Sequence, residues 1–316
     1  MLALLALAGM LAACGGAAAQ TETAKVPITR FESLFPTTVA DAPKASATLP
    51  SAVAPASAVT TAAPVTTTAW LPDAGTPDRP WRIMALGDSI TQGADPTDLS
   101  TPQTYRGVLY RSLVEAGYHV DMVGSDRTPP YGGGDPDGEG HGGYSIGPDG
   151  ATLCEVCGPA NIADNVDAWV QQSQPDIVLL LIGMNDLFPI TERRNGALRP
   201  VVPAEAPDKL AGLVAQIQAN HPEVLVFVAS YPPVPLLATN GGQIGVDFAA
   251  LNAAAVTAGS TGDRAYYVPL AEELATAWAP GDTGSDNVHP TAEGATKMAG
   301  VFFRSITSVI GPPPAG

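Results

Sequence analysis

Basic side chains are scarce in this sequence of 316 residues, which carries 15 Lys and Arg against 31 Asp and Glu for a formal net charge of −16. Proteins that bind nucleic acid present clustered Lys and Arg to the phosphate backbone and release its counterions. The chain shows no basic patch of that kind. We therefore exclude nucleic acid as a partner, and we interpret the acidity as a feature that favours solubility.

Long hydrophobic runs are missing too, apart from one at the start. Residues 1–14 are largely apolar but too few to span a bilayer as a helix, which is typical of a signal peptide. Leu11-Ala12-Ala13-Cys14 before Gly15 resembles the lipobox of bacterial lipoproteins, which implies a lipid on Cys14 and a membrane anchor. We expect an exported protein, lipid-anchored at the bacterial cell surface or periplasm. Because a basic n-region is missing, an ordinary secretory peptide is the alternative.

Cysteine is rare, with three in the whole chain, and two of them form the pair Cys154 and Cys157. A zinc site would need four ligands, and only these two cysteines are at hand. Redox-active pairs stand where a strand meets a helix, whereas this pair follows a Gly-rich loop. In an oxidising compartment, a structural disulfide between Cys154 and Cys157 is the prediction.

Residues 15–79 consist mostly of Ala, Thr, Pro, Ser and Val. Such a segment buries too little apolar area to offset the entropy lost on ordering, so we predict a disordered linker. Repeated proline keeps a linker extended, which suits a tether that holds a domain away from a membrane. The folded domain is then expected over residues 80–312.

Within that domain, short apolar runs alternate with segments of helical periodicity. This alternation predicts a three-layer α/β/α sandwich with a mainly parallel sheet, in which ligands bind outside the carboxyl ends of the strands. Strands are expected at 82–87, 119–123, 176–182, 223–230 and 265–270, and helices at 105–116, 161–172, 207–220, 247–259 and 291–310.

A candidate catalytic set lies at the two ends of this domain. Ser89 follows Gly87-Asp88, and Asp286 precedes His289 by three residues. A serine becomes a nucleophile when an imidazole takes its proton and a carboxylate fixes the tautomer of that imidazole. One turn can bring the Asp286 carboxylate to Nδ1 while Nε2 faces Ser89. Asp88 is expected to support the turn through hydrogen bonds rather than to take part in catalysis.

Histidine is also scarce, which allows elimination among four candidates. His119 opens a predicted strand, and His221 stands at a predicted helix end, where a solvated cap is the simplest interpretation. His141 competes with His289 because it lies two residues before Gly143. No carboxylate at a catalytic spacing within a motif accompanies His141, so we assign it a loop-ordering role.

Donors for an oxyanion hole are present as well. The backbone amides of Ser89 and Gly143 and the side chain of Asn185 can stabilise a tetrahedral intermediate. Each motif has a structural alternative, since Gly-Asp-Ser and Gly183-Met-Asn-Asp can be simple turns. The motifs of Ser89, Gly143, Asn185 and Asp286–His289 all occur, and in this order, which favours catalysis.

The chain resembles the SGNH hydrolases, the GDSL esterase superfamily, whose blocks supply Ser, Gly, Asn and His. It is most similar to carbohydrate esterase family three, mostly acetyl xylan esterases. That resemblance implies an SGNH/flavodoxin-like fold and a serine esterase that needs no cofactor and no metal. Serine is usual where Gly142 stands, and tryptophan where Tyr144 stands. The matching segments are Gly87-Asp-Ser-Ile90, Val123-Gly-Ser125, Glu139–Ile146, Pro175–Asp186 and Asp286-Asn-Val-His289.

One acidic cluster suggests a metal alternative. Asp135, Asp137 and Glu139 alternate like the start of a calcium loop, but a twelve-residue loop would need an acidic residue where Ile146 stands. A solvated turn is the simpler interpretation, and any calcium here would be structural.

Three functions remain open from sequence. The first is an esterase that removes short acyl groups, acetyl above all, from polysaccharide, its expected partner. The second is a lipid esterase or lysophospholipase, and the third is a non-catalytic carbohydrate-binding lipoprotein. The complete Ser-His-Asp set argues against the third. The polar insert 187–200 favours a polar ligand over lipid, with Glu192, Arg193, Arg194 and Arg199.

Overall fold

A computed structural model describes residues 74–93, 103–148, 161–187, 206–235, 252–259 and 264–314 of the chain. All of them belong to one compact unit, Ser51–Gly316. The predicted lipidation site Cys14, the predicted disulfide Cys154–Cys157 and the insert 188–200 lie outside the described residues, as does all of the predicted linker up to residue 73.

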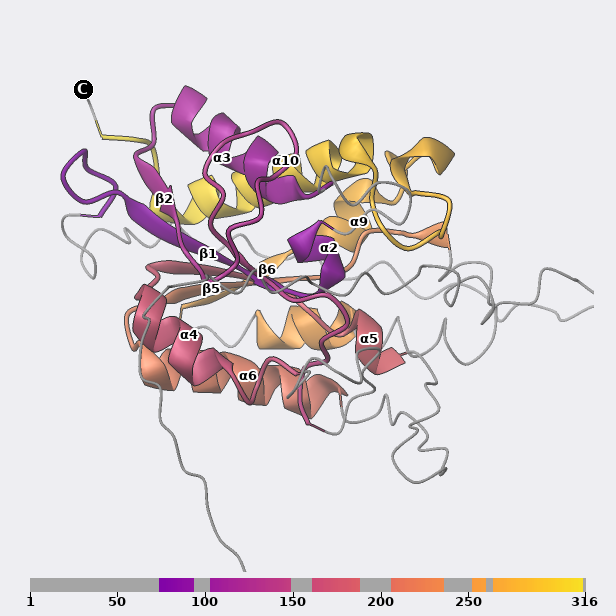
Figure 1. Ribbon diagram of the computed structural model, residues 1–316, viewed down its shortest axis with the longest axis horizontal. Helices are drawn as coiled ribbons and strands as arrows, with labels where there is room; N and C mark the ends of the chain where they lie inside the picture. The colour runs from indigo at the N-terminus through magenta and orange to yellow at the C-terminus, as the bar shows by residue number, and fades with distance from the viewer. Residues whose placement is uncertain are drawn as a thin grey trace, which may run out of the picture. The chain divides into compact units, whose positions relative to one another are not determined.

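A parallel sheet forms the centre of this unit (Figure 1). Its strands run in the order β2-β1-β4-β5-β6, and every described pair is parallel. A short sixth strand, β3, pairs with the last two residues of β1, beyond the point where β2 ends. The bounds are β1 Trp81–Gly87, β2 Val120–Met122, β3 Glu139–Gly140, β4 Ile177–Leu181, β5 Leu225–Ala229 and β6 Ala265–Val268.

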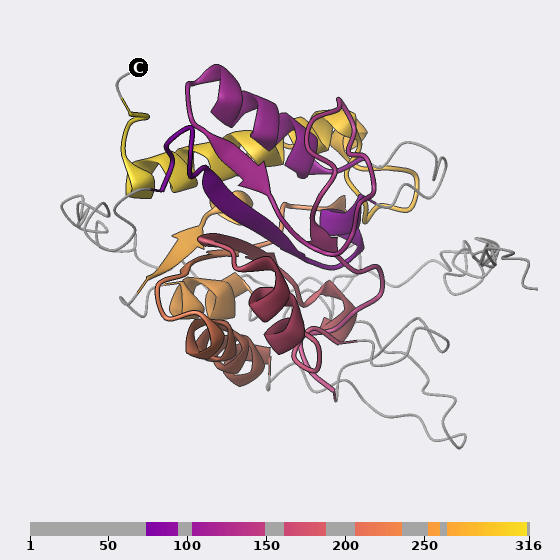
Figure 2. The same cartoon turned by 60° about the vertical axis from the view of Figure 1, so that its left-hand side comes forward.

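Helices cover both faces of the sheet, which confirms the predicted three-layer arrangement (Figures 1 and 2). The helices α3 (Tyr105–Glu115) and α10 (Ala292–Ile310) pack together on one face, and α4 (Val166–Ser173) and α6 (Ala206–Asn220) pack on the other. Three shorter helices follow strands, namely α2 Ser89–Gln92, α5 Met184–Leu187 and α9 Leu270–Leu274, and the 3₁₀ turn η3 Pro280–Asp282 lies between α9 and α10. Among the described helices, none combines the length and the apolar character needed to cross a membrane.

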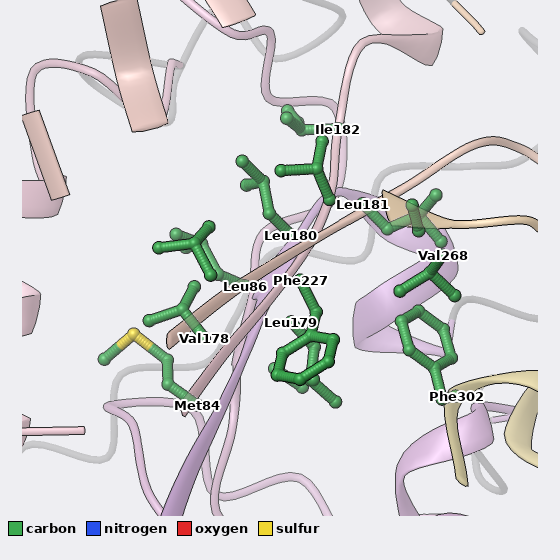
Figure 3. Close-up of a cluster of buried hydrophobic side chains, with 14 of the residues drawn as sticks. Met84, Leu86, Val178, Leu179, Leu180, Leu181, Ile182, Phe227, Val268 and Phe302 are labelled. Carbon is green, nitrogen blue, oxygen red and sulfur yellow. The ribbon is translucent and has the colours of Figure 1, made fainter. Parts of the chain in front are cut away.

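The core sits where the central strands meet the helices. Strand β4 is buried at all five positions, as a parallel strand covered on both faces should be. Figure 3 shows its side chains gathered with those of β1, β5 and β6 and with Phe302 of α10. Phe302 also stacks on Tyr105 of α3, with ring centroids 4.5 Å apart. Each fully buried aliphatic side chain contributes roughly 1.5–3 kcal/mol, so this cluster fixes the strands that carry the site.

Most element boundaries lie within two residues of expectation, and the start of α4 is the exception. Helix α4 begins at Val166 rather than at residue 161, because Asn161 Oδ1 accepts the Asp164 amide at 2.9 Å and holds the chain in a turn. Strand β6 ends at Val268, two residues early, since Pro269 cannot extend the ladder and α9 begins at Leu270. Of the helix expected at 247–259, residues 252–258 are helical, and the residues before them lie outside the described part of the chain.

Candidate active site

Ser89 lies at the carboxyl end of β1, as the first residue of α2 (Figure 1). The strand meets this turn at Gly87, where a Cβ would come within 2.2 Å of the Leu181 carbonyl and 2.4 Å of Thr91 Oγ1. Asp88 caps α2, because its Oδ1 accepts the Ile90 amide at 3.0 Å. The turn-supporting contact expected of Asp88 is therefore present.

The Asp88 carboxylate is fully buried. Burial raises its pKa above the ordinary value, and hydrogen bonds from Tyr231 and Ile90 offset only part of that rise. The Tyr231 hydroxyl donates to Asp88 Oδ2 at 2.6 Å and accepts the Met184 amide at 2.9 Å. One tyrosine thus joins the turn after β1 to the turn after β4.

His289 reaches Ser89 from the loop before α10. Its Nε2 is 2.8 Å from Ser89 Oγ, and its Nδ1 is 2.5 Å from Asp286 Oδ2. The other Asp286 oxygen accepts the amides of Val288 and His289, both at 3.0 Å, in a turn where Asn287 has φ of 61°. The structure therefore brings the three predicted side chains into one hydrogen-bonded row.

The Asp286 carboxylate is set up to stay ionised. Burial tends to raise its pKa, but the hydrogen bond to His289, the charge of that ring and the two backbone amides bring the pKa below its ordinary value. An ionised Asp286 accepts a hydrogen bond from Nδ1–H, which leaves the Nε2 lone pair facing the Ser89 hydroxyl.

The candidate oxyanion donors come from three segments. Gly143 has φ of +80°, a conformation that favours glycine, in the loop after β3. This loop is tied to the turn that follows β1, since His141 donates its amide to the Gly87 carbonyl at 2.8 Å and Gly142 donates to Gln92 Oε1 at 3.1 Å. Asn185, in α5 after β4, donates its side-chain amide to the Tyr144 carbonyl at 2.8 Å. All three segments therefore meet at the carboxyl edge of the sheet.

Residues 85–297 match the GDSL-like lipase/acylhydrolase family. The chain belongs to this family. A family 3 carbohydrate esterase from Clostridium thermocellum has a similar structure, with a TM-score of 0.54 and 30% identity, covering 73% of this chain and 96% of that one. A family 3 carbohydrate esterase from Talaromyces cellulolyticus has a similar fold, with a TM-score of 0.52 at 24% identity, covering 73% and 98%. The protein is an SGNH-type ester hydrolase.

A curated relative in Acetivibrio thermocellus, provisionally named endoglucanase X, is 28% identical over 154 residues. The match covers 47% of this chain and 58% of the relative, so the chain spans little more than half of that protein's length.

His141 has a carboxylate partner that the sequence analysis did not find. Its Nε2 lies 2.6 Å from Oε1 of Glu139, a fully buried side chain that also accepts the amide and hydroxyl of Ser125. The His141 ring stacks on Trp169 at 4.2 Å and on Tyr144 at 4.9 Å. These contacts order the loop that carries Gly143. The imidazole that contacts Ser89 Oγ is that of His289, not that of His141.

Asp186 is a second residue that sequence reasoning missed. It is buried, its Oδ2 accepts the Ile146 amide at 3.0 Å, and within the described residues its Oδ1 is buried with no hydrogen-bond partner. Burial raises its pKa to about 7, and the Ile146 amide and the charge of Lys209 only partly oppose that rise. Its position in the Gly183–Asp186 motif was the one sequence feature that could have indicated Asp186. No local feature of the sequence indicated the contact of Tyr231 with Asp88.

The acidic cluster suggested as a calcium site has protein partners instead. Asp135 accepts the amides of Met122 and Asp137, at 3.2 and 3.1 Å, and Asp137 pairs with Arg127 at 3.2 Å. Glu139 is directed to Ser125 and His141, as described above. Over the ranges that the structure describes, no group of three or more His, Cys, Asp or Glu side chains is placed to hold a metal ion.

Proposed function

We propose that this protein is an exported esterase that removes short acyl groups, acetyl above all, from polysaccharide through an acyl-serine intermediate. The observation that carries the proposal is the row from Ser89 Oγ through His289 to Asp286, with distances of 2.8 and 2.5 Å. The similarity to a family 3 carbohydrate esterase supports a sugar-bound ester as substrate.

In the first half-reaction, Ser89 Oγ attacks the ester carbonyl while His289 Nε2 takes the hydroxyl proton. The resulting imidazolium is steadied by the Asp286 carboxylate. Collapse of the tetrahedral intermediate breaks the bond to the alcohol, and His289 returns the proton to that leaving oxygen. In the second half-reaction, water attacks the acyl-serine with the same imidazole as base. The products are the free acid and the restored Ser89 hydroxyl.

The negative charge of each intermediate is held by the backbone amides of Ser89 and Gly143 and the side chain of Asn185. Such donors act on the transition state because the charge develops there, and removing one typically lowers kcat by about a hundredfold to a thousandfold. Every step uses groups of the chain itself and water. The mechanism therefore assigns no task to a metal or cofactor.

Three partly buried aromatic rings gather at the Gly143 loop, those of His141, Tyr144 and Trp169. His141 and Tyr144 lie within two residues of Gly143 in the chain, and Tyr144 and Trp169 both stack on His141. Aromatic rings of this kind pack well against the apolar face of a sugar, and their polar atoms meet hydroxyl groups. We infer from this cluster that the site takes a carbohydrate rather than a long acyl chain.

Export and lipid anchoring at Cys14 complete the proposal. Leu11-Ala12-Ala13-Cys14-Gly15 supports it, as does a linker composition that suits a tether. Labelling of bacterial cells with a palmitate analogue tests the anchor. Wild type should take up label in the membrane fraction and the Cys14→Ser variant should not; equal labelling would contradict the anchor.

The decisive experiment compares wild type with the Ser89→Ala variant on p-nitrophenyl acetate, butyrate and octanoate and on acetylated xylan. Acetate release that requires Ser89 and falls with chain length is the expected result, because a closed acyl pocket rejects long chains. A preference for octanoate would replace polysaccharide by lipid as the substrate. Equal activity of both proteins on every ester would overturn the mechanism.

A further inference from the structure

Two successive residues after β4 hold the same loop at two points. Asn185 donates its side-chain amide to the Tyr144 carbonyl at 2.8 Å, and Asp186 accepts the Ile146 amide at 3.0 Å. The loop in question is the one that contains Gly143. It is therefore clasped just after Gly143 by a donor and an acceptor from adjacent positions of α5.

The other side of this loop is fixed to the nucleophile turn. The amide of His141 bonds to the Gly87 carbonyl at 2.8 Å, and that of Gly142 bonds to Gln92 Oε1 at 3.1 Å. Gly143 thus lies between two sets of anchors, one on the segment of Ser89 and one on the segment of Asn185. The contact made by Asp186 belongs to the second set.

Stability does not account for a carboxylate at this position. The Asp186 side chain is buried, and one of its two oxygens has no hydrogen-bond partner among the described residues. A buried oxygen without a partner costs free energy. Asp176, at the opposite end of β4, is equally buried, but its oxygens are paired with the Arg79 guanidinium at 2.7 Å and the Arg82 amide at 3.0 Å.

We propose that Asp186 is a positioning residue for the oxyanion hole. By accepting the Ile146 amide, it holds the Gly143 loop against Asn185 and so fixes two of the three oxyanion donors relative to Ser89. This role rests on the proposed esterase mechanism. It does not require Asp186 to touch the substrate.

The test compares Asp186→Ala, which removes the acceptor, with Asp186→Asn, whose Oδ1 can still accept the Ile146 amide. Asp176→Asn is the matched control, since it removes a buried carboxylate from the other end of the same strand. A displacement of about 1 Å in a catalytic group can cost about a hundredfold in rate. We expect Asp186→Ala to lower kcat on that scale with little change in KM, and Asp186→Asn and Asp176→Asn to stay close to wild type.

Amide hydrogen exchange at Ile146 supplies a readout that does not depend on turnover. Exchange should become faster in Asp186→Ala while Tm is retained, and should stay slow in Asp186→Asn. Wild-type kcat in Asp186→Ala would overturn the proposal, as would equal kcat losses in both Asp186 variants. If the wild type and Ser89→Ala are equally inactive, the proposed function fails instead, so the two failures are distinguishable.

Discussion

Carboxylate side chains have different kinds of partner at the two ends of the parallel sheet. At the amino end, each of three carboxylates is paired with an arginine: Asp176 with Arg79 at 2.7 Å, Asp121 with Arg82 at 2.9 Å and Glu223 with Arg264 at 3.0 Å. At the carboxyl end, the buried carboxylates Asp88 and Asp186 accept hydrogen bonds from a tyrosine hydroxyl and backbone amides.

We therefore distinguish a stabilising amino end from a carboxyl end at which the proposed reaction takes place. Ion pairs at the amino end tie neighbouring strands together; Arg82 and Asp121 are register partners on β1 and β2. Burial at the carboxyl end raises the pKa of both Asp88 and Asp186, which means that their ionised forms weaken the fold. The charge that the proposed mechanism uses, on Asp286, is instead favoured by His289 and two amides. Substitutions at the two ends should therefore affect different quantities.

The largest effect should follow Ser89→Ala. Loss of the proposed nucleophile is expected to lower kcat by about four to six orders of magnitude, because the acyl-enzyme route is then closed and His289 and Asp286 cannot act alone. Thermal unfolding should be nearly unchanged. Steady-state kinetics on p-nitrophenyl acetate measures the first quantity and calorimetry the second. A kcat within tenfold of wild type, about 1.4 kcal/mol in barrier height, would remove Ser89 from the mechanism.

Asp286→Asn should come next. An asparagine amide can donate to His289 Nδ1, which places the proton on Nε2 and prevents that nitrogen from accepting the Ser89 proton. The expected loss in kcat is about ten-thousandfold. Asp176→Asn is the control from the amino end, and it should keep its activity. Equal kcat values in the two variants would contradict the division of roles between the ends.

Much of this arrangement could be predicted from the sequence, because it depends on residues that lie close together in the chain. The run that forms β4 and the three-residue spacing of Asp286 and His289 each predict a structure over a few positions. The sequence also placed the four motifs at one edge, because the carboxyl ends of parallel strands meet there.

The contacts that stayed hidden join distant segments or depend on packing. Tyr231 reaches Asp88 across 143 positions, and Asp186 reaches Ile146 across 40, so no periodicity or spacing indicates either pair. Glu139 and His141 are only two residues apart, but their contact depends on burial of Glu139 beside Ser125. The start of α4 was misplaced because an Asn161 side chain outcompeted helical hydrogen bonds.

The pH dependence of stability should distinguish the wild type from Asp186→Asn. Asp186 has a pKa of about 7 in the fold and 3.8 as its reference value, so between these values the folded state keeps a proton that the unfolded state has lost. Stability therefore falls as pH rises through this window, by up to roughly 4 kcal/mol in total. Asp186→Asn should match wild type near pH 4 and be more stable at pH 8. Denaturant unfolding across pH 4–8 checks this, and parallel curves for the two proteins would contradict it.

The smallest effect should come from Asp176→Asn, and it should have the opposite character. The substitution weakens the contacts of a buried carboxylate with the Arg79 guanidinium and the Arg82 amide, at the start of β1 and β4. Because the Arg79 side chain is 41% exposed, water can solvate it when the charge is removed, and the expected cost is about 1–2 kcal/mol. That cost lowers Tm by about 2–8 °C in a domain of this size. Differential scanning calorimetry should show this drop with kcat unchanged; a loss of kcat without a loss of Tm would mean that the amino end also serves the reaction.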